Sequence, residues 1–174
     1  MTDLYPVLQK LLKLVKLFDG FSDQDAREFL AIAARVDVRP GEVVLREGEN
    51  SGDAYIIASG RLRVVKSCDG ADEVLATLGP GESFGEVALL DAGPRSATVV
   101  ADTDAILLRF GRTSVASIPY VSAKLMRNVA TMMAGRLRSA SSQAVLARVA
   151  LARAIAASKA QEAPARPRTH RVMG

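Results

Sequence analysis

Hydrophobic positions recur along this chain with two different periods, and the change of period divides it into parts. Between Leu4 and Leu17, apolar residues recur every three or four positions with lysines between them, which predicts an amphipathic helix. A second helical run, AREFLAIAARVDV, follows Ser22, whose hydroxyl can accept a hydrogen bond from the Asp25 amide at the helix start. We therefore expect an N-terminal helical segment over residues 1–35.

From residue 36 to residue 112 the pattern changes to short β-rich runs separated by turn residues. The runs are VDV, EVVLREG, DAYIIASG, RLRVVKS, EVLATLG, SATVVA and AILLRF. Glycine, proline, asparagine and aspartate lie between them, as in tight turns. Seven or eight short strands without a long helix between them predict an α+β protein built on an antiparallel β jelly-roll, also called a double-stranded β-helix. The run FGEVALL is the exception, because its apolar residues suit a single helical turn.

The helical period returns after Phe110. The first run has one apolar face, made by Ile118, Val121, Leu125, Met126, Val129, Met132, Met133 and Leu137. The second run, VLARVALARAIAASKA, is rich in alanine and strongly favours a helix. We therefore expect a long C-terminal helix, or two helices, over residues 113–160, followed by a disordered basic tail over residues 161–174.

The residue types present exclude several classes of function. Cys68 is the only cysteine and His170 the only histidine, so neither an internal disulfide, a thiolate metal cluster nor a histidine-based catalytic triad can form. We therefore expect no enzyme, no metal and no cofactor. The N-terminal apolar stretch is too charged for a signal sequence and too short for a membrane span, so we expect a cytoplasmic protein.

Charge is distributed unevenly along the chain. Residues 1–104 carry 11 basic and 18 acidic residues, a net charge of −7, whereas residues 105–174 carry 12 basic residues and one acidic residue, a net charge of +11. The basic part can face nucleic acid, an anionic lipid or an acidic protein, or it can be a solvated helix face. Of these partners, we do not expect nucleic acid.

Residues 84–99, FGEVALLDAGPRSATV, carry the chemistry of a phosphodiester site. Backbone N–H groups at the start of a helical turn can donate hydrogen bonds to phosphate oxygens. Arg95 lies nine residues after Glu86, and its guanidinium can pair with the phosphate in a planar geometry. The Glu86 carboxylate can accept a hydrogen bond from a ribose hydroxyl. The segment thus offers a place for each polar part of a cyclic nucleotide.

Several motifs together resemble the cyclic nucleotide-binding domain family, as in bacterial catabolite activator proteins and protein kinase A regulatory subunits. RPGEVVLREGE is similar to the early hairpin of the family, GDAYIIASGRLRVV to its central strand pair, and LGPGESFGEVALLDAGPRSATVVA to its phosphate-binding cassette. The resemblance spans roughly residues 10–140, and several spaced glycines agree in addition to Glu86 and Arg95.

The resemblance implies a role for each residue of the cassette. Arg95 would pair with the cyclic phosphate, and Glu86 would bind the ribose 2′-hydroxyl. The other implied ligand positions are Gly85 beside the sugar, the N–H groups of Val87 and Ala88 at the phosphate, and Ser96 at the phosphate or the base edge. The family also implies that the purine lies against Val64, Leu75 and Leu78, for which ordinary core packing is the alternative.

In this family the long C-terminal helix usually completes the base site by folding over it. Arg136 could stack on the purine, and Ser139 or Ser141 could reach the base edge, although a bond to the preceding helical turn is the more ordinary use of a helical serine. A serine after the cassette arginine occurs in guanine-selective domains and in bacterial adenine-binding members, so Ser96 does not settle the base. We favour cAMP over cGMP as the ligand.

We therefore predict a sensory and regulatory module in which the bound nucleotide closes the C-terminal helix over the pocket. Activator-type relatives imply a homodimer through this helix, and the downstream protein is unknown. The alternatives are a sensor fragment of a transcription factor or channel, and an interaction domain of the same fold that binds no nucleotide. Only 33 residues follow Ser141, without a helix-turn-helix, so we do not expect a complete DNA-binding activator.

Overall fold

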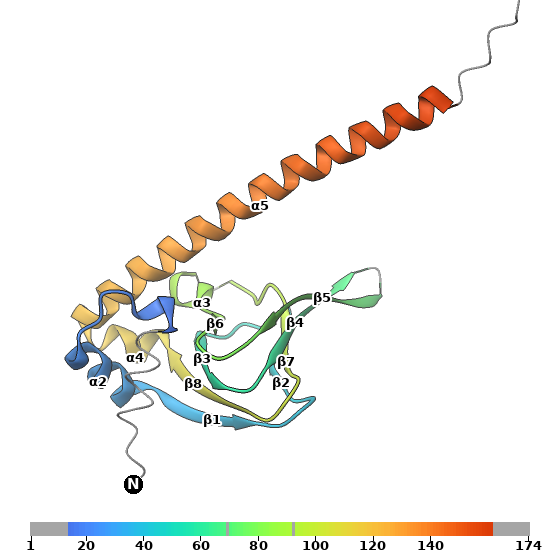
Figure 1. Ribbon diagram of the computed structural model, residues 1–174. Coiled ribbons are helices and arrows are strands. Elements are labelled where there is room, and N and C mark those ends of the chain that lie inside the picture. Colours follow the sequence, from blue (N-terminus) through green and yellow to red (C-terminus); the bar gives the residue numbers. More distant parts are fainter. Residues whose placement is uncertain (1–13, 69, 92, 162–174) are drawn as a thin grey trace, which may run out of the picture. The chain divides into compact units, whose positions relative to one another are not determined.

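The computed structural model describes residues 14–68, 70–91 and 93–161. The chain divides into two compact units, Met1–Met132 and Met133–Gly174. Among the described residues, the first unit holds two β-sheets and the short helices, and the second holds the distal part of the long helix α5 (Pro119–Gln161) (Figure 1).

Within the described residues, eight strands form two antiparallel sheets of four strands each (Figure 1). The first sheet has the order β1 (Ala34–Val38), β8 (Ala105–Gly111), β3 (Asp53–Ser59) and β6 (Ser83–Phe84). The second has the order β2 (Val43–Leu45), β7 (Thr98–Ala101), β4 (Leu62–Cys68) and β5 (Ala71–Leu78). The predicted antiparallel jelly-roll with flanking helices and a long C-terminal helix is confirmed.

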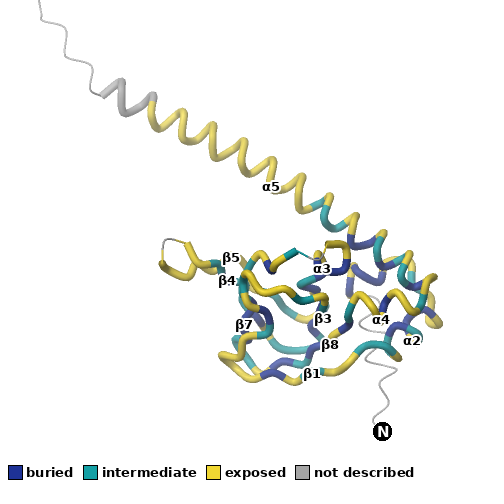
Figure 2. Tube along the Cα trace, turned by 180° about the vertical axis from the view of Figure 1, so that it is seen from behind, coloured by how far each residue is buried: buried dark blue, intermediate teal, exposed yellow. Residues whose placement is uncertain are grey.

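Side chains from both sheets form one apolar core. Figure 2 shows buried positions along the strands. Its buried members are Val38, Leu45, Tyr55, Ile57, Leu62, Phe84, Val99, Ala101, Ala105 and Leu107. Burial of this apolar surface, at about 25 cal/mol per Å², holds the sheets together. Phe84 stacks on Tyr55 of the adjacent strand, with ring centroids 5.1 Å apart and ring planes 8° apart. The segment that begins at Phe84 is therefore anchored in the core at its first residue.

The edge strand β5 is largely exposed. Every residue of β5 from Ala71 to Thr77 is exposed, and Leu78 is half-buried. Cys68, at the end of β4, is exposed and pairs with Ala71 across the hairpin. Figure 1 shows this hairpin extending beyond the other strands.

Two details of the predicted secondary structure are wrong. The run AREFLAIAARVDV is not helical throughout, because α2 (Asp23–Ile32) ends at Ile32 and β1 begins at Ala34. Backbone pairing of Ala34 with Arg109 of β8 outweighs the helix propensity of the alanines and arginine there. Strand β6 is not predicted by the sequence pattern, since two residues are too few to show a period.

The helices flanking the sheets agree only in part with the prediction. Of the helix predicted from Leu4 to Leu17, most residues lie outside the described residues, and the described end continues into the short 3₁₀ helix η1 (Lys16–Phe18). After β8, the chain forms α4 (Arg112–Ala116) and then α5. The sequence predicts either one long C-terminal helix or two, and α5 is a single helix. The tail that we expect to be disordered lies beyond the described residues, apart from Gln161.

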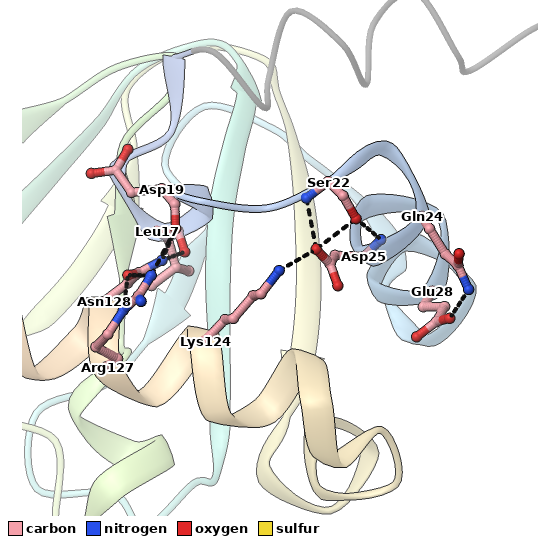
Figure 3. A network of polar contacts seen from close by, with 9 residues as sticks. All are labelled: Leu17, Asp19, Ser22, Gln24, Asp25, Glu28, Lys124, Arg127 and Asn128. Atoms are coloured by element: carbon pink, nitrogen blue, oxygen red, sulfur yellow. Dashed lines mark hydrogen bonds and ion pairs between the residues drawn. The ribbon is translucent and has the colours of Figure 1, made fainter.

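The predicted cap of α2 is present and extends into an ion pair with α5 (Figure 3). The Ser22 hydroxyl accepts a hydrogen bond from the Asp25 amide, and the Asp25 carboxylate accepts one from the Ser22 amide at 2.6 Å. Lys124 Nζ donates to the same carboxylate at 2.7 Å. Burial raises the pKa of Asp25, but the hydrogen bonds from Lys124 and Ser22 outweigh burial and lower this pKa below its ordinary value.

A buried amide makes a second connection between α5 and the N-terminal elements (Figure 3). Asn128 is 6% exposed, and its Nδ2 donates to the carbonyl oxygens of Leu17 at 2.9 Å and Asp19 at 2.8 Å. Val121, Leu125 and Val129 of the same helix are fully buried. The first turns of α5 are thus part of the packed first unit.

Beyond residue 133, large apolar side chains of α5 are exposed, including Leu137 (69%), Leu146 (68%) and Leu151 (62%). Nevertheless, in the described part of the chain no helix combines the length and the apolar character needed to cross a membrane.

We predict that Asp25→Asn lowers the thermal stability at neutral pH. The depressed pKa means that the ionised carboxylate stabilises the fold above the unfolded-state pKa, and that this contribution is lost as the pH falls through the folded-state pKa. The gap in melting temperature between the wild-type protein and the variant should therefore narrow below about pH 4. Circular dichroism melts from about pH 7 to about pH 3 measure this gap.

Glu28→Gln is the matched control, because Glu28 lies on the same helix and, among the described residues, its carboxylate accepts a side-chain hydrogen bond only from Gln24. It should leave the melting temperature almost unchanged. A gap for Asp25→Asn that stays constant down to the lowest pH would contradict the proposed charge contribution.

Candidate functional site

The segment over residues 84–99 runs from β6 through α3 (Val87–Leu90) to β7. Gly85 has φ of +73°, in the left-handed region that favours glycine. A Cβ atom at Gly85 would lie 3.0 Å from Arg95 Nη1, 3.1 Å from the Asp53 carbonyl oxygen and 3.1 Å from Leu45 Cδ1. Only glycine lets the backbone pass this close to the arginine.

Arg95 is buried in this segment, with 7% of its surface exposed. Nη1 donates to the Gly85 carbonyl at 3.0 Å, and Nη2 donates to Ser51 Oγ at 3.0 Å and to the Asp53 carbonyl. Its Nε is buried and has no hydrogen-bond partner among the described residues. Burial lowers the pKa of Arg95, and electrostatic interactions with Tyr55, Asp53 and Glu86 oppose this shift. The guanidinium nevertheless keeps its charge, since arginine is not deprotonated in proteins.

The backbone of Arg95 is held by the loop that follows β2. The Arg95 amide donates to the Glu49 carbonyl at 2.9 Å, and the Arg95 carbonyl accepts from the Gly48 amide at 2.9 Å. The Glu47 amide donates to the Thr98 hydroxyl at 3.0 Å, just past the arginine. Both sides of the arginine are therefore fixed by one loop from a distant part of the sequence.

Glu86 is the second charged residue buried in this segment. It is 1% exposed, and both of its carboxylate oxygens are buried. Its negative charge partly opposes the lowering of the Arg95 pKa by burial, so the two groups interact electrostatically. Burial of ionised groups costs several kcal/mol per ion, so two such residues in one short segment are unusual for a purely structural turn.

The helical turn α3 is anchored to the helix after β8. The Ala88 carbonyl accepts two hydrogen bonds from Arg112, from Nε at 3.2 Å and from Nη2 at 2.5 Å. The Ala88 amide donates to the Gly85 carbonyl at 3.1 Å, so this amide is engaged within the turn. Val87 is 48% exposed. The predicted donation from Val87 and Ala88 to a phosphate stays a prediction.

The remaining predicted ligand positions differ in exposure. Val64 and Leu78 are half-buried and pack against the core, which is the alternative use that the sequence left open, whereas Leu75 is 52% exposed on β5. Ser96 is exposed next to Arg95, and its carbonyl accepts from Lys66 Nζ at 3.2 Å.

The three predicted lid residues lie on α5 in the second unit, and they are Arg136, Ser139 and Ser141. All three are exposed. Their contacts with a base stay a prediction.

The sequence reasoning did not identify Ser51 and Asp53, which contact Arg95. Both lie in the run GENSGD and at the start of β3, where the residue types indicate only a turn. Asp53 contacts the guanidinium through its backbone carbonyl, for which no side-chain pattern can exist. In addition, no group of residues in the described part of the chain is suited to hold a metal ion.

Comparisons with known proteins match this segment and the sheets around it. The family model described as a cyclic nucleotide-binding domain matches residues 35–118. The "Cyclic AMP receptor protein" of Thermus thermophilus is 34% identical over 125 residues, which cover 71% of this chain and 58% of that protein. This chain therefore spans only part of the length of that relative.

The fold of this chain is similar to that of solved structures, of which two are described. The Thermus thermophilus catabolite activator protein has a TM-score of 0.72 and 33% identity, over 76% of this chain and 63% of that chain. A cyclic nucleotide-binding-like protein from Brucella abortus has a TM-score of 0.58 and 30% identity, over 64% of this chain and 96% of that chain.

We predict that Gly85→Ala destabilises the protein more than Gly41→Ala. Both glycines have positive φ, so each alanine costs about 1–2 kcal/mol in backbone strain. At Gly41 a Cβ meets nothing within 4 Å, whereas at Gly85 it crowds Arg95, Asp53 and Leu45. Urea unfolding should show an additional loss of about 1 kcal/mol or more for Gly85→Ala. Equal losses for the two variants would show that the crowding is relieved without cost.

Proposed function

We propose that this chain, which belongs to the cyclic nucleotide-binding domain family, is a cytoplasmic sensory module that binds cAMP in preference to cGMP. The observation that carries the proposal is the buried guanidinium of Arg95, whose Nε has no hydrogen-bond partner among the described residues. A buried cation with an unused donor suits an anionic ligand of limited size.

Arg95 and Glu86 would divide the polar parts of the nucleotide between them. Arg95 would bind the cyclic phosphate, which carries a single negative charge. The buried Glu86 carboxylate would accept the ribose 2′-hydroxyl, an O–H···O⁻ hydrogen bond of the strong, charge-assisted type. Gly85, whose backbone passes next to Arg95, would leave room for the sugar. The module would bind its ligand without converting it.

The preference for cAMP is supported by the name of the Thermus thermophilus relative, a cyclic AMP receptor protein. Val64 and Leu78 offer apolar surface next to the core for the purine, and Leu75 offers more of it on β5. Ser96 is exposed and could serve either base, so it does not decide between them.

The output would pass through the distal part of α5. This part of the helix exposes large apolar side chains, among them Leu137, Leu146 and Leu151. Exposed apolar surface of this kind is typical of an interaction site and would suit a homodimer interface. In the bound state, Arg136 with Ser139 or Ser141 would close over the base. Because the nucleotide would favour the closed state, its binding would shift the population toward it. The downstream partner would then recognise the closed dimer.

Titration calorimetry with cAMP, cGMP and a cyclic dinucleotide tests this proposal. We expect heat of binding with cAMP, weaker binding of cGMP and none of the cyclic dinucleotide. Arg95→Ala should weaken cAMP binding by about 2–3 kcal/mol, because a charged hydrogen-bond donor to the phosphate is lost. Absence of heat with every nucleotide would overturn the proposal and favour an interaction domain that binds none.

Arg61→Ala is the matched control, because Arg61 is exposed and its hydrogen bonds to other described residues are made by its backbone. It should bind cAMP as the wild-type protein does. Arg95→Lys keeps the charge but loses the planar fork, and it should fall between the wild-type protein and Arg95→Ala. Equal affinity of all three proteins would mean that the phosphate is held elsewhere.

A further inference from the structure

Ser51 lies in the loop between β2 and β3 and is half-buried. Its hydroxyl oxygen accepts a hydrogen bond from Arg95 Nη2 at 3.0 Å. The same oxygen accepts a longer hydrogen bond, at 3.4 Å, from the Asp53 amide. Among the described residues, the terminal nitrogens of Arg95 donate to three groups, and of these only Ser51 contributes a side chain.

These two hydrogen bonds limit the further hydrogen bonds that the Ser51 hydroxyl can make. A serine oxygen has two lone pairs and one proton. Both lone pairs are used by N–H donors, one from Asp53 and one from Arg95. The remaining capacity is therefore donation by the O–H proton, which must point away from both donors. Among the described residues, no group accepts a hydrogen bond from this proton.

The guanidinium is constrained in a matching way. Nη2 carries two protons, and they are directed to Ser51 and to the Asp53 carbonyl. Nε remains without a partner among the described residues, and Nη1 uses one proton for the Gly85 carbonyl. An incoming anion would thus meet either Nε–H or the second proton of Nη1. Ser51 holds Nη2 in the orientation that leaves these donors for it.

We propose that Ser51 is a further ligand-binding residue of this site, which orients Arg95 and donates its own O–H to an oxygen of the nucleotide phosphate. This inference rests on the proposed function. A phosphodiester has two exocyclic oxygens, each able to accept more than one hydrogen bond, so a neutral O–H donor next to the guanidinium complements it. The site is then built from two separate parts of the sequence, the loop before β3 and residues 84–99.

Calorimetry on the full chain with cAMP tests the inference through three variants. Ser51→Ala should weaken cAMP binding about tenfold, because one hydrogen bond to an anion and one support of Arg95 are lost. Ser51→Thr retains the hydroxyl and should remain within about threefold of the wild-type protein. Ser67→Ala removes an exposed hydroxyl from β4 in the same unit and should leave the affinity unchanged.

Phosphorus NMR of bound cAMP separates direct donation from a purely structural role. Loss of a donor to the phosphate should move the ³¹P resonance of the nucleotide bound to Ser51→Ala, whereas Ser67→Ala should leave it in place. An unchanged ³¹P resonance, or an affinity of Ser51→Ala equal to that of the wild-type protein, would overturn the inference. Equal weakening by Ser51→Ala and Ser51→Thr, with lowered melting temperatures for both, would assign Ser51 to loop packing and overturn it as well.

The two proposals fail in distinguishable ways. A wild-type protein that gives no heat with any nucleotide overturns the proposed function itself. A wild-type protein that binds cAMP, together with a Ser51→Ala variant that binds it equally well, overturns only the role of Ser51.

Discussion

Burial of the Arg95 guanidinium is the constraint on which the arrangement of this site depends. An unpaired cation in a protein interior costs several kcal/mol, so the surrounding chain must supply acceptors. They come from the Gly85 carbonyl, the Asp53 carbonyl and the Ser51 hydroxyl. Gly85 must lack a side chain for this contact, and the loop after β2 must fix the Arg95 backbone. The sheets bring these segments together, although they are far apart in the sequence.

The fold could be predicted largely because turn residues separate the strands so regularly. Glycines and aspartates between short β-branched runs indicated an antiparallel sandwich, and the Ser22 cap indicated the start of α2. Local pattern failed where pairing with a distant strand decided the outcome. Ala34 lies in a helix-favouring run but pairs with Arg109, and the two residues of β6 are strand only because β3 lies beside them.

The same difference between local pattern and distant contact separates the site residues that could be predicted from those that could not. Gly85, Glu86 and Arg95 could be selected from the sequence because a charged pair within one short segment is visible as a motif. The burial of Glu86 and Arg95 agrees with a functional role. Ser51 could not be selected, since a serine in a polar turn is ordinary until the fold places it 3.0 Å from a guanidinium. Asn128 was missed for a similar reason, because its partners are the carbonyls of Leu17 and Asp19, more than 100 residues earlier.

The exposed Cys68 has a practical consequence for work on this protein. Because the chain contains one cysteine, a thiol-reactive fluorophore would attach at a single position without any mutation. That position lies at the end of β4, in the β4–β5 hairpin. One engineered cysteine on the distal part of α5 would add a second dye. Energy transfer between the two dyes could then be followed in single molecules as nucleotide is added.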